Sequence, residues 1–288
     1  MSERFAADWL KLRESADLAA RDSASARRFA AALPPGAKRL IDLGAGTGSN
    51  TRALLPRIAG DQEWSLVERD RDLIAAQDDA FTAWARRQGY PIQTGGGRIT
   101  IDAKPASWRI TPRALDLAHD LERLATIEAH GFTAAAFFDL VSQSWLERFV
   151  ALLQKQRLPL LAVLTVDGRR LWRPGSEHDA IVADAFARHQ RRDKGFGAAL
   201  GGDAADALQK LLRDAGFTVA RAASDWRLGP RDAALLAALI DGETSAAREA
   251  APEAQAQIDA WERQCRAQLA SGTLALTIGH CDILALPA

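Results

Sequence analysis

The spacing of apolar residues changes near residue 38. Before that point, the apolar positions Trp9, Leu10, Leu12, Ala16 and Leu18 form a stripe that predicts one or two helices over residues 5–33. The turn Pro34-Pro35-Gly36 should end this helical stretch. The next apolar run, Arg39–Leu43, is short, continuous and followed by glycines, which is typical of a buried parallel strand.

From residue 39 to residue 166, short apolar runs alternate with helical patterns. Alternation of this kind indicates a parallel sheet whose strands are joined by crossover helices, an α/β architecture with helices on both faces. The expected strands are 39–43, 64–68, 134–141 and 158–166, with a hairpin formed by 98–102 and 107–115. The expected helices are 49–58, 71–88, 116–129 and 144–156.

The last third of the chain is less regular. Helices are expected over 177–190 and 204–215, and two more near 231–241 and 252–270. The patterns at 217–227 and 274–286 predict two further strands.

A glycine-rich turn, Gly44-Ala45-Gly46-Thr47-Gly48, follows the first strand directly and is preceded by Asp42. Glycine lets a ligand approach the backbone closely, and ligands of open α/β sheets lie outside the carboxyl ends of the strands. A carboxylate at Asp42 would repel a phosphate and attract an ammonium group. The turn therefore favours S-adenosylmethionine, which carries an ammonium and a sulfonium, over a dinucleotide.

A second carboxylate, Glu68, ends the second expected strand, twenty residues after Gly48. An acid at this position can accept hydrogen bonds from both hydroxyls of a ribose. The dinucleotide fingerprint has a different glycine spacing, G-x-G-x-x-G, so an NAD-dependent oxidoreductase is the less favoured alternative.

These residues resemble the class I S-adenosylmethionine-dependent methyltransferases, in particular bacterial ones of the small-molecule type. The family motif Asp/Glu-x-Gly-x-Gly-x-Gly is matched by Asp42, Gly44, Gly46 and Gly48, and its ribose acid by Glu68. The resemblance implies a Rossmann-like, seven-stranded sheet, mostly parallel with the last strand antiparallel. It also makes the strands at 217–227 and 274–286 similar to the family's antiparallel sixth and seventh strands.

The resemblance implies further contacts with the cofactor. Asp116-Leu117 is similar to the family's adenine-contacting pair, with Asp102-Ala103 as a competing assignment. Phe138–Ser144 is similar to its fourth conserved motif, so Ser142 and Gln143 are expected near the transferred methyl group. The complete set expected to bind cofactor is Asp42, Gly44, Ala45, Gly46, Gly48, Glu68, Arg69, Asp116, Leu117, Ser142 and Arg21.

Arg21 belongs to that set because an N-terminal helix often closes over the cofactor in small-molecule methyltransferases. Arg13, Asp17 and Arg21 fall on one helical face at four-residue spacing. Arg21 is therefore a candidate partner of the methionine carboxylate. A surface ladder of ion pairs explains the same spacing and is the favoured interpretation.

The acceptor is expected to be a small molecule methylated on oxygen or nitrogen. The fourth motif lacks the Asn/Asp-Pro-Pro-aromatic sequence of enzymes that methylate bases or glutamine. The run His189–Gly197 is rich in charge and glycine, which suits a binding loop, although a solvated loop explains it equally well. His189 is the candidate general base, and Gln143, Trp145, Arg191 and Lys194 are the candidate substrate-binding residues.

The sequence divides into an N-terminal helical segment, 1–36, and a methyltransferase domain, 37–288, with helical cap insertions near 173–200 and 229–272. The second insertion is interpreted as a substrate cap, a dimer contact or additional packing. The chain is expected to act as a monomer or homodimer.

Composition limits the possible partners. The 37 basic residues equal the 37 acidic ones, which disfavours a nucleic-acid partner. No long apolar run suggests a signal peptide or membrane span, so a cytoplasmic protein is expected. Cys265 and Cys281 lack zinc-like spacing and are expected to be reduced, and no metal site is predicted. A non-catalytic nucleotide-binding protein of the same fold remains a third interpretation.

Overall fold

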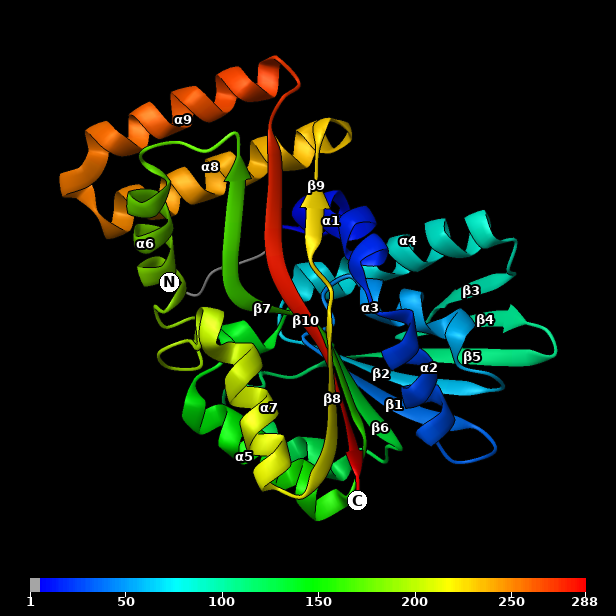
Figure 1. Cartoon of the computed structure of the whole chain (residues 1–288). Helices are drawn as coiled ribbons and strands as arrows, with labels where there is room; N and C mark the ends of the chain where they lie inside the picture. Colours follow the sequence, from blue (N-terminus) through cyan, green and yellow to red (C-terminus); the bar gives the residue numbers. More distant parts are fainter. Residues whose placement is uncertain (1–5) are drawn as a thin grey trace.

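The computed structural model of the chain describes residues 6–288, and in these residues ten strands form one sheet (Figure 1). Along the sheet the order is β3-β4-β5-β2-β1-β6-β7-β10-β8, and β9 pairs with β10 beside this path. The strands are β1 (Lys38–Leu43), β2 (Gln62–Glu68), β3 (Ile92–Gly95), β4 (Arg98–Ala103), β5 (Ala106–Ala114), β6 (Gly131–Ala135), β7 (Leu160–Arg173), β8 (Phe217–Ala223), β9 (Trp226–Leu228) and β10 (Ala275–Pro287).

The centre of the sheet confirms the expected fold class. β5, β2, β1, β6 and β7 are parallel neighbours. β10 lies between β7 and β8 and runs antiparallel to both. In the edge hairpin, β4 likewise runs antiparallel to β5. The expectation of an antiparallel sixth strand is wrong, because β8 pairs with the reversed β10 and therefore has the same direction as β7.

Further details differ from the sequence predictions, among them β7, which continues to Arg173 instead of ending at residue 166. β6 ends at Ala135, earlier than the strand expected over 134–141. Ala136 has a positive φ of 48°, which turns the chain out of the sheet, and residues Phe138–Leu140 form a 3-10 helix. The helix expected over 116–129 is a 3-10 helix of only six residues, Leu121–Thr126. The predicted hairpin is confirmed as β4–β5.

Helices cover both faces of the sheet. In β1, Leu40 belongs to one hydrophobic core and Ile41 to the other, as alternate strand residues point to opposite faces. Phe29 of α2 (Ser23–Ala32) and Phe81 of α4 (Arg71–Gln88) pack in the first core. The second core contains the apolar faces of α5 (Gln143–Gln156) and α7 (Ala204–Asp214). α1 (Ala7–Ala20) and the short α3 (Ser49–Leu54) lie near the ends of β1 and β2 (Figure 1).

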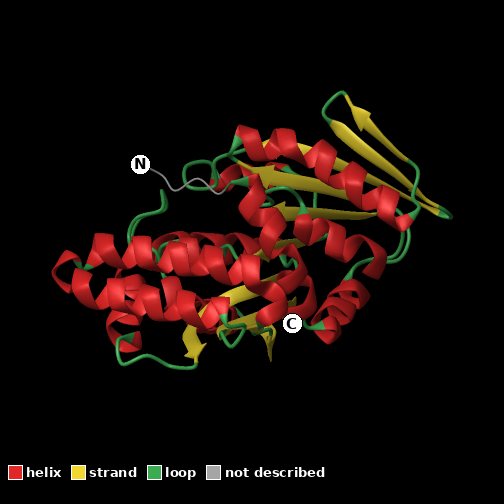
Figure 2. Ribbon diagram, turned by 90° about the horizontal axis from the view of Figure 1, so that it is seen from above, coloured by secondary structure: helices red, strands yellow, loops and turns green. Residues whose placement is uncertain are grey.

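The distal halves of β7 and β10 extend beyond the other strands and carry a group of helices. These are α6 (Asp179–Gln190), α8 (Ala233–Ala250) and α9 (Gln255–Ala270), here called the three-helix layer; Figure 2 shows it at one end of the molecule. The buried carboxylate of Glu243 in α8 binds Arg170 Nε and accepts a hydrogen bond from Trp172 Nε1 at 3.0 Å, which fixes the layer to β7.

The three-helix layer coincides with the two expected insertions. The division into two domains stays a prediction, and residues 1–5 of its N-terminal segment lie outside the described residues. Between residues 6 and 288, no helix combines the length and the apolar character needed to cross a membrane.

Candidate functional site

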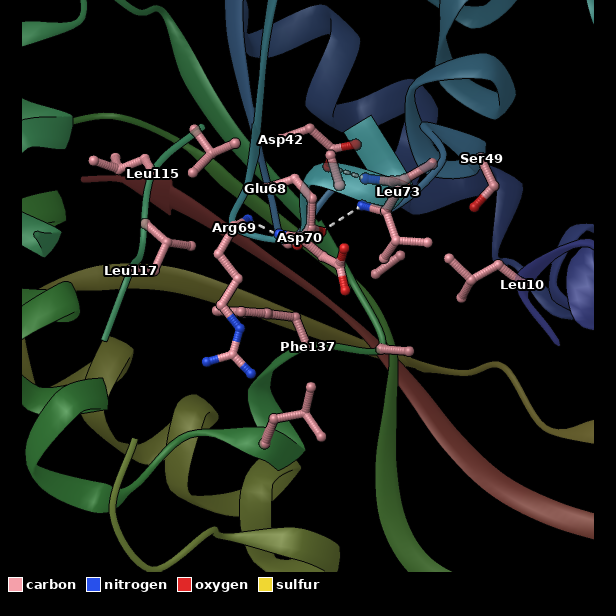
Figure 3. Close-up of a pocket in the computed structure, with 18 of the residues that line it drawn as sticks. Leu10, Asp42, Ser49, Glu68, Arg69, Asp70, Leu73, Leu115, Leu117 and Phe137 are labelled. Carbon is pink, nitrogen blue, oxygen red and sulfur yellow. Dashed lines mark hydrogen bonds between the residues drawn. The ribbon is translucent and has the colours of Figure 1, made fainter. Parts of the chain in front are cut away.

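A cavity of about 780 Å³ opens at the carboxyl ends of β1, β2, β5 and β6. Its walls come from α1, the glycine loop after β1, the ends of these strands and the loop that contains Lys194 and Phe196. Figure 3 shows Asp42, Glu68, Arg69, Leu117 and Phe137 around this space. The volume falls within the range of pockets that enclose a cofactor-sized ligand.

The glycine loop depends on the absence of side chains. Gly44, Gly46 and Gly48 have φ values of 58°, 54° and 82°. A Cβ on Gly46 would lie 2.9 Å from Leu10 Cδ1 of α1, and one on Gly44 would lie 2.6 Å from Phe137 Cδ2. The loop backbone therefore forms part of the cavity wall, with α1 on one side and the end of β6 on the other.

Several N–H groups of this loop are already paired within the protein. Ala45 donates to the Val67 carbonyl at 2.9 Å and Gly48 to the Ala45 carbonyl at 2.8 Å. Gly46 donates to Glu68 Oε2 at 2.9 Å. A pyrophosphate is normally seated by backbone N–H groups of such a loop. Here three of those donors are occupied, and one of them by a carboxylate that would repel phosphate.

Asp42 lies beneath the loop. Its carboxylate accepts hydrogen bonds from Asn50 Nδ2 at 2.5 Å, Thr51 Oγ1 at 2.9 Å and Thr133 Oγ1 at 2.7 Å. Burial raises the pKa of this carboxyl group, and the three hydrogen bonds oppose that effect. Asp42 contributes to the cavity wall, but its side chain is closed off from solvent. Its carboxylate therefore acts on a ligand chiefly through Asn50, which lines the cavity, and through the local negative charge.

Glu68 sits at the end of β2, where it fixes the loop and the following turn. Besides the bond from Gly46, its Oε1 accepts N–H bonds from Arg69 at 2.8 Å and Asp70 at 2.9 Å. A carboxylate offers about four acceptor positions, so capacity remains for a ligand hydroxyl. The adjacent Arg69 spans the cavity edge, with its Nη2 at 3.5 Å from the Lys194 carbonyl.

Asp116 and Leu117 follow β5 and line the same cavity. Asp116 accepts a bond from the Ala118 N–H at 3.0 Å, and its other oxygen lies 3.1 Å from His119 Nδ1. The competing Asp102 is in β4, beside Lys104 in the edge hairpin, and does not line the cavity. The geometry thus favours the Asp116 assignment.

The end of β6 corrects three expectations. Ala135, Ala136, Phe137 and Leu140 line the cavity, whereas Ser142, Gln143 and Trp145 do not. The strand stops early, so Ser142 becomes the N-cap of α5, and Gln143 and Trp145 lie in its first turn. Ser142 caps that helix by accepting from the Trp145 N–H at 3.3 Å, and Gln143 donates to Glu147 at 2.9 Å. Trp145 is buried behind the wall, and its Nε1 donates to the Leu117 carbonyl at 2.6 Å.

The charged run His189–Gly197 contributes only some of its residues to the cavity wall. His189 does not line the cavity; its Nε2 lies 3.4 Å from Glu249 Oε2 of α8, so the structure does not support its role as general base. Arg191 also points elsewhere and pairs with Asp203 at 2.7 Å. Lys194, by contrast, lines the cavity together with Phe196, and its role in substrate binding stays a prediction.

The N-terminal helix covers the cavity with residues other than the expected one. Arg21 follows the end of α1, does not line the cavity, and donates to Asn50 Oδ1 at 2.6 Å. Arg13 and Asp17 line it instead and form the predicted i,i+4 ion pair at 3.0 Å. Asp17 also accepts from Trp226 Nε1 at 3.1 Å, and the Arg13 guanidinium lies 4.8 Å from the centre of the Trp226 ring.

Several residues of the cavity wall could not be identified from the sequence. Leu10 appears there only as part of an apolar stripe, and Asn50 and Phe137 carry no motif signal. Phe196 is two positions from Lys194, a spacing that would have placed both side chains on one side of an extended loop. No helix of the 229–272 insertion lines the cavity within residues 6–288, so this insertion does not cap the site. The described residues contain no cluster of metal-ligating side chains.

Several solved structures match nearly the whole chain at low identity. A cyclopropane synthase from Mycobacterium tuberculosis has a TM-score of 0.48 and 13% identity, over 98% of this chain and 94% of that one. A cyclopropane-fatty-acyl-phospholipid synthase-like protein from Lactobacillus casei has a TM-score of 0.48 and 12% identity, over 99% and 96%. A methyltransferase from Geobacter sulfurreducens, solved with S-adenosylhomocysteine, has a TM-score of 0.43 and 14% identity, over 100% of both chains.

No protein-family model and no curated protein matches the sequence. The functional assignment accordingly depends on the chemistry of this chain's own cavity.

Proposed function

We propose that this chain is an S-adenosylmethionine-dependent methyltransferase that acts on oxygen or nitrogen of a small molecule. The observation that carries the proposal is the pairing of Gly46 N–H with Glu68 at the mouth of the cavity. This contact places a carboxylate where a dinucleotide would need free N–H donors. It leaves a site that favours a ligand with positive charge and ribose hydroxyls.

The cavity residues suggest one orientation of the cofactor. Glu68 would accept a hydrogen bond from a ribose hydroxyl, and Asp116 with Leu117 would hold the adenine. The methionine part would lie along Gly44–Gly46, where Asp42 and Asn50 supply negative charge and polar contacts from below. Leu10 and Phe137 pack directly against these glycines, so a side chain at either position would push them into the cavity.

When bound, the cofactor supplies a methyl group on a positively charged sulfur, which an acceptor lone pair attacks as the carbon–sulfur bond breaks, leaving S-adenosylhomocysteine. The protein's part is alignment and exclusion of water. Phe137 and Leu140 provide an apolar surface beside the glycine loop. Arg13 and Asp17 also line the cavity, and because they form an ion pair their charges largely cancel.

The two alternatives have less support. An NAD-dependent oxidoreductase would have to bring a pyrophosphate beside Glu68 and onto N–H groups that are already paired. A non-catalytic protein would not need to keep a bare-backbone loop open to a large cavity.

Isothermal titration calorimetry with S-adenosylhomocysteine and with NADH tests the proposal. We expect S-adenosylhomocysteine to bind with a micromolar dissociation constant and NADH not to bind measurably. NADH binding without S-adenosylhomocysteine binding would establish the oxidoreductase alternative. Failure of both ligands at millimolar concentration would favour the non-catalytic one.

A further inference from the structure

We propose that the methyl acceptor is an anion with a flat apolar body, which packs against the joined ring surface of Phe137 and Phe196 with its negative group toward Lys194 and Arg69. This inference rests on the proposed function, because it assigns the part of the cavity that the cofactor would leave open.

The aromatic residues lie next to the expected methyl position. The Phe137 ring is against Gly44, where the methionine part of the cofactor would lie. The Phe196 ring meets Phe137 edge to face, with centroids 5.7 Å apart. Trp145 supports both rings from behind, at 5.5 Å from each. A path of rings thus leads from the glycine loop toward the charged run, and such surfaces bind flat apolar groups.

Charge is distributed unequally around the cavity. Asp42, Glu68 and Asp116 lie on the side assigned to the cofactor. The loop edge of the cavity carries Lys194 and Arg69, whose Nη2 lies 3.5 Å from the Lys194 carbonyl, and Asp70 follows Arg69 as a carboxylate of the cavity wall. The cations outnumber the carboxylate there, so this edge favours a carboxylate, sulfonate or phosphate on the acceptor.

The loop is built to turn Lys194 and Phe196 toward the cavity together. Asp193 Oδ1 accepts N–H bonds from Gly195 at 2.7 Å and Gly197 at 2.9 Å, which folds the loop around its carboxylate. Gly195, between the two lining residues, has a φ of 102°, and a Cβ there would lie 2.8 Å from Arg69 Nη1. Only glycine allows Arg69 to approach the loop this closely.

The neighbouring basic residues have other structural roles. Arg191 pairs with Asp203, and Arg192 pairs with Glu249 of α8 at 3.0 Å. Neither lines the cavity. Within the run, the cationic side chain that lines the cavity is that of Lys194.

Two matched fluorescent probes test this inference on protein saturated with S-adenosylhomocysteine. 8-Anilinonaphthalene-1-sulfonate has a flat apolar body and a sulfonate, and N-phenyl-1-naphthylamine has the same rings without the anion. We expect the sulfonate to bind more tightly, and Lys194→Gln to weaken it by about tenfold while leaving the neutral probe unchanged. Arg191→Gln is the control, because it removes a basic residue of the same run that lies outside the cavity.

Phe196→Ala should weaken both probes, because both use the ring surface. Equal effects of Lys194→Gln and Arg191→Gln on the sulfonate would show binding at the surface and overturn the inference. A Lys194→Gln variant with weaker S-adenosylhomocysteine binding would assign Lys194 to the cofactor and overturn it too. Thermal unfolding verifies that each variant is folded, and Lys194→Met repeats the test if Lys194→Gln is not.

The proposed function is tested separately, by S-adenosylhomocysteine binding to the unmodified protein. If that ligand binds and the probes show no preference for the anion, only the acceptor class fails. If it does not bind, the proposed function itself fails.

Discussion

The backbone N–H of Gly46 donates to Glu68 Oε2 at 2.9 Å, which joins the loop after β1 to the end of β2. The same carboxylate accepts from the N–H groups of Arg69 and Asp70. One side chain therefore shapes two neighbouring turns at the cavity while keeping acceptor capacity for a ligand.

Replacing Glu68 by alanine should weaken S-adenosylhomocysteine binding by about 1–3 kcal/mol, the range for losing hydrogen bonds to a charged group. Calorimetric titration measures the change. Glu63→Ala is the matched control, because Glu63 is in the same strand and pairs with Arg109 away from the cavity. A Glu68→Ala variant that binds as tightly as the Glu63→Ala variant would rule out the ribose role.

Gly46→Val should abolish cofactor binding. The new side chain would meet Leu10 and fill the space where a ligand meets the loop, and a φ of 54° strains any residue with a Cβ. Gly36→Val separates the two effects, since Gly36 has a φ of 83° but open space around it. Both variants should lose about 1–3 kcal/mol of stability from strain. Calorimetry should show that Gly46→Val loses ligand binding and that Gly36→Val keeps it. Normal affinity in Gly46→Val would contradict the assignment of the glycine loop to the cofactor site.

His280 should make the protein less stable in acid. Burial, reinforced by nearby Arg13, lowers the pKa of this imidazole to about 4. The unfolded chain binds the proton near pH 6.5 and the folded protein only near pH 4, so stability falls as pH decreases through this window. The loss between pH 7.5 and pH 5 should be about 2 kcal/mol.

Urea unfolding of the unmodified protein and of His280→Gln at the two pH values measures this contribution. The variant should lose less stability than the unmodified protein, because its side chain does not titrate. Identical losses would show that His280 is protonated equally in both states.

Glu243→Ala should destabilise the protein by about 3–5 kcal/mol, because it leaves the largely buried Arg170 and Trp172 Nε1 without their carboxylate. Glu249→Ala, in the same helix, removes an exposed partner of Arg192 and should change stability by less than about 1 kcal/mol. Urea unfolding compares the two. Similar values would mean that Glu243 does not fix the three-helix layer to β7.

The sequence predicts the sheet well because strand and helix patterns are local. Leu40 and Ile41 supply the alternating core contacts of β1, and the glycines after them mark the ligand loop. Asp42 and Glu68 directly follow such local patterns, and both line the cavity. The choice between Asp116 and Asp102 depends instead on tertiary structure, because it follows from the pairing of β5 with β2.

The positions of the other expected site residues depend on contacts between segments that are distant in the sequence. A single positive φ at Ala136 ends β6 early and moves Ser142 and Gln143 out of the wall. The partner of His189 is Glu249, sixty residues later in the chain, and only tertiary packing brings them together. Arg13 lies within α1 and lines the cavity, whereas α1 ends at Ala20, just before Arg21. Periodicity alone does not determine where the helix ends.

The loop with Lys194 and Phe196 is fastened at both ends. Arg192 binds Glu249 before it, and after it Ala199 donates to the Arg191 carbonyl and Leu200 to the Val141 carbonyl at 2.9 Å. A segment held this way has lost most of its conformational freedom when the chain folds. Binding an acceptor therefore does not require the loop to lose further conformational entropy. A preorganised wall of this kind discriminates among ligands by shape rather than by adapting to them.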